Sequence, residues 1–180
     1  MRFKWRLLIL SVLSFWGCDN PPQNSTPPAG APPRQTNVPQ PTFHLNNQQP
    51  KLPTLTLYIG PKQITAELAT TVTQIATGMM FRKQMGTNEG MLFVFRQPQR
   101  ASFYMKNTTV PLSAAYIDPD GVIHEIVDLK PLDETPVLAS SDNIQYVLEV
   151  NQGWFKENGI GAGTVITTDK GTLREAFFGR

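Results

Sequence analysis

Polar residues interrupt an otherwise apolar segment of the chain, FYMKNTTVPLSAAYIDPDG. Lys106 and Asn107 stand between two apolar runs, in a place where a buried sheet would not accommodate an ammonium group. Arginine supplies a fork of N–H donors, lysine a point charge, and asparagine both a donor and an acceptor. Such groups suit a small anionic or polar ligand. We therefore expect a ligand site built from Arg82, Tyr104, Lys106, Asn107 and Thr108.

Charged residues are unevenly distributed around this segment. Residues 82–106 contain five cations and one acid, whereas residues 118–149 contain eight acids and one cation. The alternative to a ligand site is that two solvated faces of opposite charge partly neutralise each other. The full chain has 16 basic and 14 acidic residues, and three of the basic ones fall among the first six. Without these three the remainder is nearly neutral, so its charge gives no reason to expect nucleic acid as a partner.

The sequence contains no recognised catalytic motif. It has no G-x-S-x-G elbow, no P-loop, no H-E-x-x-H helix and no Cys-x-x-Cys pair. We therefore expect no catalytic residue. The alternative is a hydrolase acting on an envelope polymer through paired carboxylates, for which the candidates are Glu149, Asp118 and Glu125. Such an enzyme would bring at least two titratable groups to one cleft.

No metal ion or other cofactor is expected either. His124 is the one histidine of the expected folded domain, and Glu125 follows it in a predicted strand, where neighbours point to opposite faces. A zinc site needs three or four ligands, and the domain has no other histidine and no cysteine. The single cysteine of the chain, Cys18, excludes an internal disulfide.

The first 17 residues have the pattern of a lipoprotein-type signal peptide. A basic start is followed by ten mostly apolar residues, which as a helix would cover about 15 Å, half of a bilayer core. Cys18 follows Gly17 directly, where bacterial lipoprotein signals place the cysteine that receives the lipid. We expect Cys18 to be lipidated and to anchor the protein to a membrane. Phe15 and Trp16 are bulkier than usual at such a site, so plain secretion is the alternative.

Residues 18–53 are expected to form a disordered, proline-rich tether. Ten of the 16 prolines lie between Pro21 and Pro53, among Gln, Asn, Ser and Thr. Such a stretch cannot bury enough apolar surface to offset the entropy lost on ordering, and its proline pairs favour extended conformations. The folded domain is expected over residues 54–168, and residues 169–180 as a C-terminal tail.

Within residues 54–168 the hydrophobic pattern predicts a mainly β fold. Thr54–Gly60 alternates apolar and polar residues, which indicates a half-buried strand. Thr71 and Gln74 form a capping box, which predicts a short helix from there. About eight short strands and one or two short helices are expected, arranged as a small antiparallel β sandwich or flattened barrel. The other expected strands begin near residues 63, 90, 101, 112, 122, 145 and 163.

Several segments occur in the order typical of one prokaryotic family. They are ATGMMFRKQM, GMLFVF, FYMKNTTVPLSAAYIDPDGVI, YVLEVNQG and GIGAGTVI. On these segments, from about Leu55 to Ile166, the chain resembles the family known as domain of unknown function 192. The resemblance implies a small, mainly β domain that is often exported or lipid-anchored, and it implies no established activity. Many members have Trp where Tyr104 stands, and many have Asp where this chain has Ser113.

Taken together, these features predict a membrane-anchored binding or accessory module of the cell envelope. Its anchor would be the lipid at Cys18, on the outer face of the cytoplasmic membrane or on the outer membrane, and without lipidation the protein would be secreted or periplasmic. Its site would be a partly basic pocket for a small anionic or polar ligand. Ser113, in the place of an aspartate, argues against a carboxylate mechanism shared by the whole family.

Overall fold

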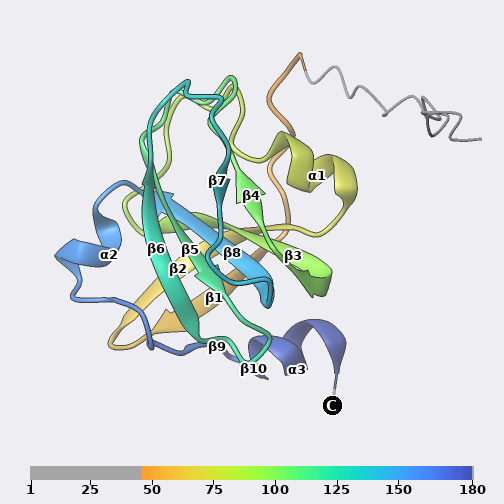
Figure 1. Ribbon diagram of the computed structural model, residues 1–180. Helices are drawn as coiled ribbons and strands as arrows, with labels where there is room; N and C mark the ends of the chain where they lie inside the picture. The colour runs from red at the N-terminus through yellow and green to blue at the C-terminus, as the bar shows by residue number, and fades with distance from the viewer. Residues whose placement is uncertain (1–45, 180) are drawn as a thin grey trace, which may run out of the picture. The chain divides into compact units, whose positions relative to one another are not determined.

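The structure is a computed structural model that describes residues 46–179 (Figure 1). The expected signal peptide, Cys18 and most of the expected tether lie outside the described residues. Ten strands and three short helices follow one another along the described part. The strands are β1 (Thr54–Ile59), β2 (Lys62–Ala69), β3 (Glu89–Gln99), β4 (Ser102–Phe103), β5 (Leu112–Ile117), β6 (Ile123–Leu129), β7 (Val137–Leu138), β8 (Ile144–Asn151), β9 (Ile166–Thr168) and β10 (Gly171–Thr172). The helices are α1 (Val72–Thr77), α2 (Trp154–Glu157) and α3 (Leu173–Phe178).

Eight of the strands form one sheet in the order β10-β9-β1-β2-β3-β8-β5-β6, and β4 pairs with β7 in a separate ribbon. The mainly β prediction is confirmed. All strand pairs are antiparallel except β2 and β3, which run parallel, with Ala66 opposite Gly90. A parallel pair needs a crossover connection, and here the segment that contains α1 supplies it.

The large sheet curls but does not close into a barrel. Its last strands on either side, β10 and β6, do not pair with each other. One isolated bridge, between Val122 and Val165, joins the residue before β6 to the residue before β9. The sheet is therefore an open, curled surface whose two faces are both covered, and no closed lumen is available as a binding site.

Each face of the sheet has its own hydrophobic core. Because strand residues alternate between faces, neighbours such as Val147 and Leu148 of β8 belong to different cores. The first core includes Leu57, Leu148 and Trp154. The second lies under α1 and the β4–β7 ribbon, which cross the same side of the sheet in Figure 1. The candidate site lies in this second layer.

The start of α1 agrees with the sequence pattern. Thr71 is its N-cap and forms the expected capping box with Gln74. The helix ends at Gly78, whose φ of +47° is unfavourable for other residues. A Cβ atom at Gly78 would also lie 3.3 Å from the ring of Phe93. Glycine therefore allows the end of α1 to approach β3 closely.

Ordered structure extends beyond the predicted domain limits on both sides. Gln49 and Leu52, within the expected tether, are both buried, at 9% exposure each. At the other end, β10 and α3 form within the expected tail. Thr172 caps α3 in a capping box with Glu175, and Leu173 is fully buried.

Candidate functional site

Glu149 is a buried carboxyl group in the middle of the large sheet. It lies on β8 with Met91 opposite on β3 and Ala114 opposite on β5, both of them apolar. The residue is only 4% exposed, and no ion pair or hydrogen bond links its side chain to another described residue. Burial raises the pKa of the Glu149 carboxyl to about 8. An acid in this largely apolar setting, with no partner from the described chain, is unfavourable in its ionised form, so its position calls for an explanation.

A small pocket lies against Glu149, between the sheet and the layer of α1 and β4. Its volume is about 50 Å³. Its wall is largely apolar and its rim polar and exposed, where Ser102 and Tyr104 stand. The wall includes Met79, Met80, Phe93, Phe103, Met105 and Leu112. These lining residues come from the segments GMM, GMLFVF, FYMKNT, PL and YVLEV, so the fold gathers the family-like segments around one carboxyl group.

Two buried threonines, Thr77 and Thr108, are among the lining residues, and the hydroxyl of each donates its proton to a backbone carbonyl oxygen. Thr77, the last residue of α1, donates from Oγ1 to the Thr73 carbonyl oxygen at 2.7 Å. Thr108 donates from Oγ1 to the Lys106 carbonyl oxygen at 3.1 Å. A hydroxyl group has one proton and two lone pairs, so with the proton engaged each of these oxygens can take a further partner only as an acceptor.

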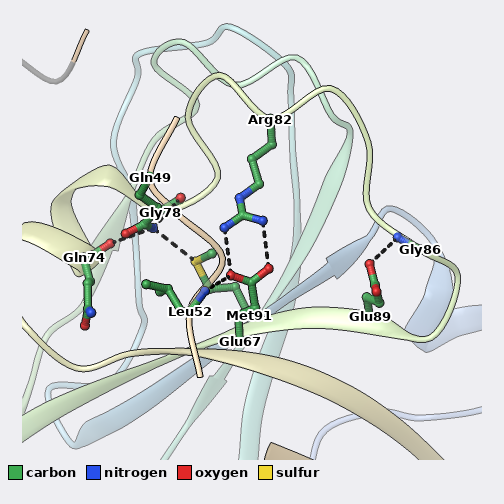
Figure 2. A network of polar contacts seen from close by, with 9 residues as sticks. All are labelled: Gln49, Leu52, Glu67, Gln74, Gly78, Arg82, Gly86, Glu89 and Met91. Carbon is green, nitrogen blue, oxygen red and sulfur yellow. Dashed lines mark hydrogen bonds and ion pairs between the residues drawn. The ribbon is translucent and has the colours of Figure 1, made fainter. Parts of the chain in front are cut away.

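Arg82 does not line this pocket. It forms two parallel bonds with Glu67, from Nη1 to Oε1 at 2.7 Å and from Nη2 to Oε2 at 2.8 Å. Figure 2 shows the pair, together with the backbone N–H of Leu52, which donates to Glu67 Oε2 at 2.7 Å. Arg82 lines a second hollow, of about 30 Å³, and Met79 lines both hollows.

Lys106 and Asn107 line neither of these two hollows. The Lys106 ammonium lies 3.5 Å from a carboxylate oxygen of Glu134, and both side chains are largely exposed. Asn107 has φ +53°, a conformation that asparagine tolerates better than most residues. Its carbonyl oxygen accepts from the backbone N–H of Phe81 at 2.8 Å. This backbone hydrogen bond connects the turn after β4 to the loop after α1, so the role that the structure shows for Asn107 is structural.

Of the five residues expected to bind a ligand, the structure thus brings two to the Glu149 pocket, Tyr104 and Thr108. Thr77 was not among the expected residues, because nothing in its sequence context shows that the end of α1 meets β8. Glu149 was named only as a candidate carboxylate. The signal for it was a charged residue inside the apolar strand QYVLEV.

The other two candidate carboxylates have partners elsewhere. Asp118 accepts from the backbone N–H groups of Asp120 and Val122, both at 2.9 Å, and lies 3.3 Å from His124. Glu125 accepts from the backbone N–H and the hydroxyl of Ser140. Neither Asp118 nor Glu125 lines the Glu149 pocket.

Ser113 faces a carboxylate on the neighbouring strand. It lies opposite Asp128 in the pairing of β5 with β6, and its hydroxyl donates to Asp128 Oδ1 at 2.5 Å. The same hydroxyl accepts from the backbone N–H of Gly153 at 3.0 Å. Position 113, where many members of the family are expected to have an aspartate, is thus hydrogen-bonded in this chain to a carboxylate on β6.

Residues 46–179 contain neither a metal-binding cluster nor a membrane-spanning helix. No three side chains among the described His, Cys, Asp and Glu residues are grouped so that they could hold a metal ion. Within the same range, none of the helices has the length and apolar character needed to cross a membrane.

Comparison with known proteins gives a family and two similar crystal structures. Residues 55–168 match the family model DUF192, described as Uncharacterized ACR, COG1430. A candidate transcription regulator from Sinorhizobium meliloti 1021 is 30% identical, with a TM-score of 0.63, over 67% of this chain and 98% of that one. A protein of unknown function from Novosphingobium aromaticivorans DSM 12444 is 32% identical, with a TM-score of 0.60, over 64% of this chain and 85% of that one. No curated protein matches the chain. The matched range runs from β1 to β9, more than half of the chain, and the chain therefore belongs to the DUF192 family.

Proposed function

We propose that the protein is a lipid-anchored binding module of the cell envelope, and that the Glu149 pocket holds one small polar group of its ligand. The proposal rests on one observation, the unpartnered Glu149 carboxyl that lines a pocket with access from the surface. Leaving a buried polar group without a partner costs about 1–3 kcal/mol. A ligand that supplies the missing partner would offset this cost in the bound state.

The dimensions of the pocket limit what enters it. About 50 Å³ is far less than the 300–1,000 Å³ of typical small-molecule sites, and leaves room for one functional group. The rest of the ligand would lie outside, against the exposed rim at Ser102 and Tyr104. A polymer or a membrane component that presents one such group suits this arrangement better than a free metabolite enclosed on all sides.

The anchor is proposed from the sequence of residues 1–18. Lipidation at Cys18 would hold the domain at the outer face of the cytoplasmic membrane or at the outer membrane, within reach of envelope components. Without lipidation, the same leader would deliver a secreted or periplasmic protein. Mass spectrometry of the full-length chain from membranes tests this, because Cys18→Ser should abolish the acyl mass and release the protein from the membrane fraction. An unmodified Cys18 in the membrane fraction would contradict it.

A glycosidase-like hydrolase is less well supported. That mechanism needs two carboxyl groups on either side of the scissile bond. Glu149 is the one carboxylate among the residues that line its pocket, and Asp118 and Glu125 are bonded elsewhere. The geometry therefore favours binding over this type of hydrolysis.

The pocket is tested by the carboxyl ¹³C resonance of Glu149 in the full-length chain in detergent micelles, assigned with Glu149→Gln. Small cationic, neutral and anionic probes are added separately at constant ionic strength. We expect at least one probe to shift the Glu149 resonance saturably while the resonance of the exposed Glu157 does not move. If no probe shifts the Glu149 resonance, the pocket is not a binding site.

A further inference from the structure

We infer that the group held in the Glu149 pocket is a primary ammonium, R–CH₂–NH₃⁺. This inference rests on the proposed function and adds the chemical class of the ligand. The sequence-based expectation was a small anionic or polar ligand, and the inference excludes its anionic part, because the structure places the cations of the expected site elsewhere.

The buried polar side chains of the pocket are acceptors. Thr77 and Thr108 have given their protons to backbone carbonyl oxygens, and the ionised Glu149 carboxylate has only lone pairs. An ammonium group has three N–H donors and no acceptor, so it matches three such oxygens. Once Glu149 is ionised, an anion would meet a like charge and no side-chain donor among these three groups. The hydroxyls of Ser102 and Tyr104 are exposed at the rim and can bond to the remainder of the ligand.

The nearby cations of the chain are already paired. Arg82 is bonded to Glu67, and Lys106 lies beside Glu134. No lysine, arginine or histidine is among the residues that line the pocket. No cation from the described part of the chain pairs with the Glu149 carboxylate. The geometry therefore leaves this carboxylate free to pair with a cation of the ligand.

The size and the wall of the pocket agree with this class. A volume of about 50 Å³ leaves room for one ammonium group and its attached methylene carbon. Met79, Met105 and Phe103 form an apolar wall against which a methylene carbon can pack. In such a water-poor setting the attraction between unlike charges is stronger than in water.

Binding of an ammonium to this carboxyl is coupled to loss of its proton. With a pKa of about 8, the Glu149 carboxyl is about nine-tenths protonated at pH 7, so affinity should rise about tenfold between pH 7 and pH 9. Other titratable groups face it from β5 and from the segment after β4. The Tyr116 hydroxyl donates to the Val137 carbonyl oxygen, and burial raises the pKa of Tyr116 well above the usual value for tyrosine. Tyr104 lies at the exposed rim of the pocket. Among the lining residues from β3 and α1 no titratable side chain occurs.

The experiment follows the Glu149 carboxyl ¹³C resonance in the full-length chain at pH 8. Methylammonium chloride is compared with potassium chloride, methanol and sodium acetate at equal ionic strength. We expect methylammonium alone to move the resonance saturably to the ionised position. If methanol or acetate binds and methylammonium does not, the ammonium inference is overturned while the proposed pocket stands. If no probe binds, both fail, and an equal effect of potassium would make this a monovalent metal site instead.

A pair of matched variants tests the acceptor arrangement. Thr77→Val removes one lining oxygen at nearly constant volume, and Thr109→Val makes the same change at an exposed residue outside the pocket. We expect about tenfold weaker methylammonium binding in Thr77→Val and unchanged binding in Thr109→Val. Equal affinities in the two variants would overturn the role of Thr77.

The source of the ammonium is distinguished by larger probes. Ethanolamine represents an amine-bearing lipid headgroup and glucosamine an amino sugar, and the tighter binder identifies the source. N-acetylglucosamine has no ammonium and is expected not to bind. Binding of N-acetylglucosamine as tight as that of glucosamine would contradict the inference.

Discussion

Arg82 and Glu67 form a largely buried, two-bond ion pair that joins the loop after α1 to β2. The two side chains are 12% and 13% exposed, and their bonds measure 2.7 Å and 2.8 Å. The Leu52 backbone N–H donates to the same carboxylate, so the pair also fixes the chain just before β1. Arg82 is thus engaged by a partner within the fold, and we assign it a structural role.

Replacing Arg82 should therefore lower stability more than it lowers ligand binding. Arg82→Leu leaves Glu67 buried with only the Leu52 N–H as partner, and breaking such a pair costs about 3 kcal/mol or more. Urea denaturation measures the free energy of unfolding. The exposed neighbour gives the control, because Lys83→Leu should change it by no more than about 0.5 kcal/mol.

A double-mutant cycle separates the pair from its surroundings. Glu67→Leu alone should also destabilise, whereas Arg82→Leu with Glu67→Leu should be less destabilised than the sum of the two single variants. Simple additivity would show that the two side chains act independently. Loss of probe binding in Arg82→Leu at unchanged stability would instead restore Arg82 as a ligand residue.

Gln49 fastens the chain before β1 to the end of α1. Its Nε2 donates to the Gly78 carbonyl oxygen at 2.8 Å and to the Gln74 carbonyl oxygen at 3.3 Å (Figure 2). Gln49→Ala leaves both carbonyl groups without this donor, so we expect a loss of about 1–3 kcal/mol in the free energy of unfolding. Gly78 is the C-cap of α1, so loss of the Gln49 contact should also accelerate amide hydrogen exchange at the end of this helix, next to the Glu149 pocket.

The adjacent glutamine provides the control for this prediction. Gln48 is exposed, so Gln48→Ala should leave both the stability and the exchange rates of α1 unchanged. Equal effects of the two substitutions would mean that the contact of Gln49 with α1 does not contribute to stability in solution.

Much of the fold could be predicted from local patterns in the sequence. The alternation in Thr54–Gly60 gave β1, and the capping box at Thr71 gave α1. The same kind of capping box at Thr172 lies beyond the expected domain limit, so α3 was not predicted. The parallel pairing of β2 with β3 was not predicted, since pairing direction depends on how the connection crosses the sheet.

The candidate site was harder to predict, because it depends on contacts between distant segments. Arg82 and Lys106 have the charge of ligand-binding residues, but each lies near an acid that sequence spacing does not reveal. Glu149 stands in an apolar strand, and the sequence alone cannot show whether such an acid is paired. The acceptor character of Thr77 follows only from the bond that its hydroxyl makes with the helix.

The cross-strand pair of Ser113 and Asp128 makes a prediction about the residue expected in relatives. Ser113→Asp would place two carboxylates directly opposite each other on β5 and β6, which is unfavourable. We expect a loss of about 1–3 kcal/mol in the free energy of unfolding at neutral pH, because the new charge is buried as well as opposed. The loss should shrink at low pH as a carboxylate is protonated.

Exchanging the two residues tests whether the carboxylate has moved between strands. Ser113→Asp combined with Asp128→Ser should recover most of the lost stability, because the aspartate can accept from both the serine hydroxyl and the Gly153 N–H. Thermal unfolding of the four variants in the cycle is the measurement. If the double variant is no more stable than Ser113→Asp alone, position 113 does not accept a carboxylate in this chain.

Glu149 makes a prediction about the pH dependence of stability. Its carboxyl has a pKa of about 8 in the folded chain and an ordinary value of 4.5. Between these values the folded state retains a proton that the unfolded state releases, so the free energy of unfolding falls as the pH rises. The stabilisation is complete below pH 4.5 and lost above pH 8, and the shift corresponds to about 3–5 kcal/mol.

Glu149→Gln isolates this contribution, because the amide has nearly the same shape and does not titrate. We expect its urea-unfolding profile to be flatter than that of the wild type between pH 4.5 and pH 8, so that the variant becomes the more stable protein at the alkaline end. Glu157→Gln, the same change at an exposed residue, should follow the wild-type profile. Parallel profiles for wild type and Glu149→Gln would mean that Glu149 is already ionised and has a partner in the folded protein. The proposed pocket, which depends on an unpartnered Glu149 carboxyl, would then be contradicted.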